Sequence, residues 1–249
     1  MKEEVALIPG IYSYCDSWCE RCPFTKRCQN FALQYPDGLK QPNMDAETLV
    51  KRLMETLELT KSYVDKARQQ RLLPEHRAIE QETKAVTRHT EGETVWNPLT
   101  ALCDDYLRQT AEWLKQEKDL LEQAGHQQAF ETNLGLRTEQ EAVVLLNTLK
   151  DAWETLKWYR TLIPVKVVAA LQINNGMTPD AVLKAYFNGK AKLVLVSIDY
   201  SLKAWHTLLE NYPEKTDDVL DMLILLDHIR RQMETTFPEA RHFRRPGLD

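Results

Sequence analysis

The sequence predicts an all-α protein, an irregular helical bundle with a short N-terminal four-cysteine metal knuckle. Apolar residues recur at steps of three and four positions along most of the chain, which is the spacing of one helix face. The 249 residues include only eight glycines, and β-branched runs of alternating polarity are almost absent. We therefore expect a chain that is nearly all helix, with about six or seven helices.

The expected helices follow the apolar spacing in chain order. The stretches that carry it are residues 31–35, 45–70, 75–89, 97–125, 138 to beyond 164, 178–188, 191–209 and 216–233. Two of them have clear first turns: Asn97 is an N-cap with Pro98 behind it, and Thr138 with Glu141 forms a capping box. Breaks are expected at the turn 36–38 and in the loop 90–96.

Other residues are expected to end, bend or cap a helix. Gly125 ends the helix that begins at Asn97, and Pro164 kinks its helix without ending it. Asn188-Gly189 breaks the stretch in which it lies. Thr216, followed by two acidic residues that suit the positive end of the helix dipole, caps the last helix.

Three stretches make up the expected organisation, which is one compact domain overall. Residues 1–36 form the cysteine knuckle and a short helix, residues 45–238 the bundle, and residues 239–249 a polar, irregular tail. The 32 Lys and Arg against 37 Asp and Glu give a net charge of −5, which argues against nucleic-acid binding. Without a secretion signal or an apolar run of ~18 residues, we expect a cytoplasmic protein with no membrane segment.

The cysteines are the most informative residues. Four of the five, Cys15, Cys19, Cys22 and Cys28, have the spacing C-x3-C-x2-C-x5-C, with which four thiolates can surround one metal. The fifth, Cys103, lies in an apolar helical context and is expected to be a small buried residue. We expect Zn²⁺ in a closed, structural site, because the reducing cytoplasm directs clustered cysteines toward metal.

Several alternatives to zinc stay open. An iron–sulfur cluster also takes four cysteines at close, irregular spacing, and Cys22-Pro23 is reminiscent of the Cys-Pro of bacterial ferredoxins. Two disulfides, or four thiols without a joint role, are the remaining possibilities. The first three cysteines have the spacing of radical-SAM enzymes, but the chain lacks their alternating strands and glycine-rich turns. Tyr14, Trp18 and Phe24 are expected to dock the knuckle onto the bundle.

A second candidate site lies far from the cysteines. Asp199 and His206 share one helix face, and Asp227-His228 lies in an equally apolar stretch of the next helix. If both faces point inward, these residues form a buried group of the kind found at catalytic sites. The alternative is a structural ion-pair network that includes Lys203.

Three stretches carry a resemblance to a known group of proteins. They are Tyr14–Thr25, Gly189–Trp205 and the closing Phe-Arg-Arg-Pro-Gly-Leu-Asp. Together they resemble an all-helical bacterial protein family with an N-terminal cysteine cluster. The resemblance implies a bacterial cytoplasmic protein, and it implies no activity and no catalytic residue.

Three functions follow from these observations as hypotheses. The first is a non-enzymatic structural or interaction protein with a structural zinc site, bound to another protein or to itself. The second is a redox or electron-transfer protein with an iron–sulfur cluster. The third is a helical-bundle enzyme that uses Asp199, His206, Asp227 and His228. The sequence has no catalytic signature, so we expect the protein not to be an enzyme.

Overall fold

The computed structural model describes residues 6–35, 54, 97–172 and 181–249, and these are helical with no strand among them. The prediction of an all-α protein is therefore confirmed. The chain divides into two compact units, Met1–Leu33 with Asn97–Asp249, and Gln34–Trp96. The expected helices at 45–70 and 75–89, the loop at 90–96 and the start of the helix expected at 178 lie outside the described residues.

The N-terminal segment consists of short turns. Three single-turn 3-10 helices, η1, η2 and η3, are followed by the short helix α1. Their bounds are Ile11–Ser13, Cys19–Arg21, Thr25–Arg27 and, for α1, Gln29–Gln34. Ile11 is the one buried residue in the described part of this segment. The segment therefore has almost no hydrophobic core of its own.

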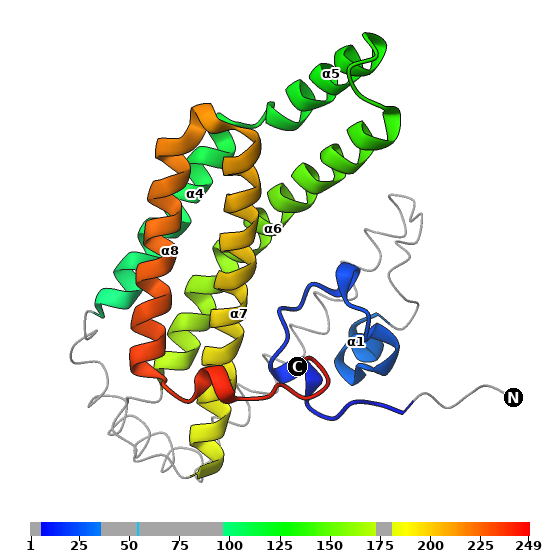
Figure 1. Ribbon diagram of the computed structural model, residues 1–249. Helices are drawn as coiled ribbons and strands as arrows, with labels where there is room; N and C mark the ends of the chain where they lie inside the picture. The colour runs from blue at the N-terminus through cyan, green and yellow to red at the C-terminus, as the bar shows by residue number, and fades with distance from the viewer. Residues whose placement is uncertain (1–5, 36–53, 55–96, 173–180) are drawn as a thin grey trace, which may run out of the picture. The chain divides into compact units, whose positions relative to one another are not determined.

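Four long helices form the bundle. They are α4 (Pro98–Gln116), α6 (Glu139–Leu171), α7 (Ala181–Asn211) and α8 (Thr216–Thr236). Helix α4 packs against α6 and α8, and α7 packs against the same two helices, so the four close into a ring. Each runs antiparallel to its neighbours (Figure 1).

Three smaller elements complete this unit. Helix α5 (Leu120–Asn133) packs on α6, and the single turns η5 (Pro213–Lys215) and η6 (Ala240–His242) flank α8. None of the described helices has both the length and the apolar character that crossing a membrane requires.

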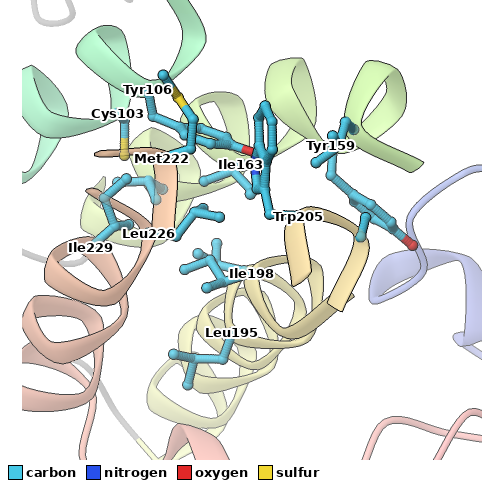
Figure 2. Packing of buried hydrophobic residues seen from close by; sticks show 14 of the residues in the cluster. Cys103, Tyr106, Tyr159, Ile163, Leu195, Ile198, Trp205, Met222, Leu226 and Ile229 are labelled. Atoms are coloured by element: carbon cyan, nitrogen blue, oxygen red, sulfur yellow. The ribbon is translucent and has the colours of Figure 1, made fainter. Parts of the chain in front are cut away.

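The core lies along the axis of the four-helix ring (Figure 2). All four helices contribute side chains that are almost wholly inaccessible to solvent. Representative members are Cys103 and Tyr106 of α4, Ile163 of α6, Ile198 and Trp205 of α7, and Leu226 and Ile229 of α8. Burial of Cys103 raises the pKa of its thiol to about 12, so it stays a neutral packing residue as predicted.

Two predicted helix starts are confirmed by their hydrogen bonds. The Asn97 side chain accepts a hydrogen bond from the backbone N–H of Leu99 at 2.9 Å, and Pro98 is the first residue of α4. Thr138 and Glu141 form the expected capping box at the start of α6. Helix α6 also continues through Pro164, as predicted.

Three boundary predictions are wrong. Helix α4 ends at Gln116, and Gly125 lies inside α5, because the chain turns after Glu117 and packs a new helix on α6. Helix α7 runs unbroken through Gly189, for a packing reason given below. Thr216 is the first residue of α8, and its hydroxyl donates to the Pro213 carbonyl instead of capping the helix.

The C-terminal tail is also more ordered than its composition predicts. It forms the turn η6, in which Ala240 is fully buried. Lys192 of α7 donates a hydrogen bond to the Arg241 carbonyl at 2.8 Å. The tail is therefore fixed against α7.

Candidate metal centre

The three turns of the N-terminal segment position the cysteines. Cys19 begins η2 and Cys22 follows its end, with the Cys22 N–H donating to the Cys19 carbonyl at 3.2 Å. Cys28 follows η3 in the same way, and Cys15 comes just after η1. Each thiol thus lies where a tight turn changes the direction of the chain, and this brings residues that are up to thirteen positions apart close together.

All four cysteines line one small cavity. Its other walls include Ile11, Trp18 and Phe31, so the surroundings of the thiols are largely apolar. The cavity volume is ≈ 20 Å³, whereas a single water molecule needs roughly 10–15 Å³. Each of the four thiols is half-buried and none is in a disulfide.

The surroundings of Cys19 and Cys22 raise the pKa values of their thiols. Burial and then the charges of the neighbouring thiols raise the pKa of Cys19. Burial raises the pKa of Cys22 too, although a hydrogen bond from the Phe24 backbone partly lowers it. The Phe31 backbone N–H donates to the Cys28 sulfur at 3.4 Å. The charges of the neighbouring thiols thus act on Cys19 and Cys22, which is consistent with the four cysteines lying close together.

The thiols are gathered, but they are not arranged around a single ion. Among the residues that the structure describes, no three His, Cys, Asp or Glu side chains are placed to hold a metal ion. The predicted four-cysteine metal knuckle is therefore not supported as a metal site, although the four cysteines share one cavity. A metal at this position is a proposal, which is made below.

Asp16 connects this segment to the bundle. The Tyr159 hydroxyl of α6 donates to the Asp16 carboxylate at 2.6 Å, and the Trp158 indole N–H donates to its carbonyl at 3.1 Å. The other carboxylate oxygen of Asp16 accepts from the Trp18 backbone at 3.1 Å. Burial, followed by the bond to Asp16, raises the pKa of Tyr159, so this hydroxyl stays protonated. Figure 2 shows the Tyr159 hydroxyl pointing toward the N-terminal segment.

Trp18 forms the second connection to α6. Its ring stacks on Trp158 with centroids 5.0 Å apart and meets Tyr159 edge-on at 6.1 Å. The Arg21 guanidinium lies 4.0 Å from the centre of the Trp18 ring, on the same side of the bundle. Arg21 also pairs with Asp151 and Glu154 of α6, at 2.5 and 2.6 Å.

Gly189 provides the third contact, on α7. The Tyr14 ring packs so closely on this glycine that an added Cβ would lie 2.2 Å from its Cε1 atom. Phe243 of the C-terminal tail covers the same spot, with its ring centroid 5.1 Å from that of Tyr14. Gly189 therefore serves as a surface for close packing inside a continuous helix, which explains why it does not break α7.

The docking role predicted for Tyr14 and Trp18 matches these contacts. Sequence reasoning missed Asp16 in the segment, and Tyr159 and Gly189 on the receiving helices. A glycine within a helical apolar pattern was the one available signal, because such a glycine can mark a close approach of another segment.

The other candidate residues are not joined to one another. Asp199 pairs with Arg241 at 2.5 Å, and Asp227 pairs with Arg230 and Arg231. His206 is exposed beside Glu210, and His228 is exposed as well. In the described part of the chain no hydrogen bond or ion pair links any two of these four candidates.

Comparisons with protein-family models, with curated proteins and with solved structures return no match to this chain. The resemblance to a bacterial family therefore stays a prediction, and the site has to be interpreted from its own geometry.

Proposed function

We propose that Cys15, Cys19, Cys22 and Cys28 bind one iron–sulfur cluster and that the protein transfers electrons through it. The observation that carries the proposal is that all four thiols line a single small cavity with largely apolar walls. Cys₄ ligation is the usual way in which proteins hold [2Fe–2S] and [4Fe–4S] clusters. When bound, such a cluster supplies one-electron oxidation and reduction.

The arrangement of the thiols favours a cluster over a single zinc ion. Four sulfur atoms would each have to lie ~2.3 Å from one zinc. Among the described residues, no three side chains are placed around one ion in this way. In a cluster the thiolates are shared among several irons, so they can remain farther apart.

The chain's own residues fit the needs of a cluster. The backbone N–H of Phe31 donates to the Cys28 sulfur, and that of Phe24 bonds to Cys22. Hydrogen bonds to the sulfurs and limited solvent exposure are the means by which a protein sets the reduction potential of a cluster. Ile11, Trp18 and Phe31 limit the access of water to the same cavity.

Metal analysis of anaerobically purified protein tests the proposal. We expect roughly two or four irons per chain with an equal amount of acid-labile sulfide, and a visible absorption band that bleaches in air. Cys22→Ser should lose this iron. The matched control, Cys103→Ala, should keep it, because Cys103 is buried in the bundle core. A folded protein with four titratable thiols and no iron after anaerobic purification and iron–sulfide reconstitution would overturn the proposal.

A structural zinc site is the second candidate. It is favoured by the docking contacts on α6 and α7, because anchoring a segment that lacks a core is what structural zinc does. The same metal analysis separates the two candidates. One zinc per chain, with no visible absorption band, would favour the structural protein.

A further inference from the structure

A second, larger pocket opens beside the cysteine cavity. It is walled by the N-terminal segment on one side and by α6, α7 and the C-terminal tail on the other, and its volume is ≈ 380 Å³. Cys15 and Cys22 belong to its wall as well as to that of the four-cysteine cavity. Pockets of a few hundred Å³ accommodate small organic molecules. A molecule bound here would lie against the proposed metal centre.

The walls of this pocket are mainly aromatic and aliphatic. Tyr159 and Tyr200 stack with their rings 5.7 Å apart and nearly parallel, at 9°. Tyr200 is 52% exposed, so part of its ring surface remains uncovered. Trp18, Phe24 and, from α7, Val196 also line the pocket. A planar aromatic molecule is the natural complement of such a wall.

One hydroxyl in the wall is available to a ligand. Thr155 lines the pocket, and its hydroxyl makes no hydrogen bond within the described parts of the chain. The neighbouring Ser197 hydroxyl already donates to the Leu193 carbonyl at 2.8 Å. The Thr155 hydroxyl is therefore free to bond to a ligand that carries an oxygen.

The charged residues of the wall are already paired. Arg21 bonds to Asp151 and Glu154, and Asp16 accepts from Tyr159. Arg245 bonds to Asp249 at 2.7 Å. An ionic ligand would have to break one of these pairs, so the pocket favours an uncharged molecule.

We propose that this pocket binds a small, uncharged, planar aromatic molecule that bears a hydroxyl or carbonyl oxygen, a phenol or quinone, with its ring on Tyr200 and its oxygen on Thr155. The inference rests on the proposed function in one respect, because the metal centre stabilises the segment that forms half of the pocket. Ligands of this class accept or donate electrons, which is consistent with a neighbouring cluster.

Binding of 1-naphthol and of naphthalene to the full-length, metal-loaded protein tests the inference by calorimetry. We expect saturable binding of 1-naphthol, and Thr155→Val should weaken it about tenfold while leaving naphthalene unaffected, because only 1-naphthol has an oxygen to bond. Thr161→Val is the matched control, since Thr161 lies on the exposed face of α6 and should change neither ligand. Val196→Phe should obstruct the pocket and weaken the binding of both.

The iron content of the same samples separates the two proposals. Protein that contains iron but shows no saturable 1-naphthol binding, or binds it equally well after Val196→Phe, would overturn this inference alone. Protein that binds 1-naphthol as described but takes up no iron would support the pocket and overturn the cluster.

Discussion

The N-terminal segment and the helical bundle are stabilised by different means. The bundle buries a continuous core from four helices, whereas the described part of the N-terminal segment buries only Ile11. The segment is attached through Asp16, Trp18 and Tyr14 to surfaces of α6 and α7. A segment without a core needs a metal, a disulfide or a partner surface to stay folded. The bundle should therefore fold by itself, and the segment should depend on the proposed metal and on its docking contacts.

The largest expected effect comes from the bundle core. Trp205 is fully buried and meets Trp113 edge-on, with centroids 4.9 Å apart. Trp205→Ala should lower the free energy of unfolding by about 3–5 kcal/mol, measured by urea denaturation and circular dichroism. Val168→Ala, on the exposed side of α6, should stay within about 0.5 kcal/mol of the parent. Equal effects of the two substitutions would contradict the placement of the core.

The second prediction compares alanine substitutions at two glycines, one with open space around it and one at the contact with the N-terminal segment. Gly125 of α5 has open space where a Cβ would lie, so Gly125→Ala should raise stability by about 1 kcal/mol through helix propensity. Gly189→Ala should instead displace Tyr14 and cost about 1–3 kcal/mol, with faster trypsin cleavage after Arg21 or Arg27. Adding Tyr14→Ala should remove most of the cost in stability. If Gly189→Ala stabilised the protein as Gly125→Ala does, the close packing on α7 would be refuted.

The hydroxyl of Tyr159 tests the contact with α6. Tyr159→Phe removes the 2.6 Å hydrogen bond to the Asp16 carboxylate and should cost about 1–3 kcal/mol, because the acceptor is charged. The cost should appear as faster proteolysis of the N-terminal segment at unchanged helix content. Tyr200→Phe removes an exposed hydroxyl without a hydrogen-bond partner among the described residues, and should leave both readouts unchanged. Docking through Asp16 would be wrong if the two variants behaved alike.

The smallest expected effect concerns the C-terminal tail and pH. Hydrogen bonds from Arg245 hold the pKa of Asp249 below its ordinary value. The bond therefore stabilises the folded protein above the ordinary pKa of about 3.9, and this stability is lost as the pH falls through the lowered pKa. Asp249→Asn should cost less than about 1 kcal/mol at pH 7 and nothing in strong acid. A cost of Asp249→Asn that is the same at pH 7 and in strong acid would contradict the assignment to this bond.

Local signals predicted much of the bundle. The Asn97 cap and the Thr138–Glu141 capping box depend on residues within three positions of one another, so they are legible in the sequence. Apolar spacing likewise predicted the helix at 216–233, and the buried residues Val219, Leu226 and Ile229 of α8 lie within it. These features need no knowledge of which segments meet in space.

Long-range contacts explain what the sequence did not reveal. The Asp16–Tyr159 bond joins residues 143 positions apart, and Gly189 is retained in a helix because Tyr14 packs on it. The Asn-Gly pair predicted a helix break at Gly189. The helix continues there because the Tyr14 ring packs on the space that a side chain would occupy. The spacing of the cysteines predicted their gathering, whereas the second pocket depends on how the segment docks.

Hydrogen exchange before and after metal removal tests the contrast between the two regions most directly. With the proposed metal bound, amides in residues 6–33 should be protected together with those of the bundle. After the metal is removed by a chelator under reducing conditions, protection should be lost in residues 6–33 and kept in α4, α6, α7 and α8. Unchanged protection of residues 6–33 after metal removal, or its loss throughout the bundle, would contradict a metal-dependent segment docked on a self-sufficient bundle.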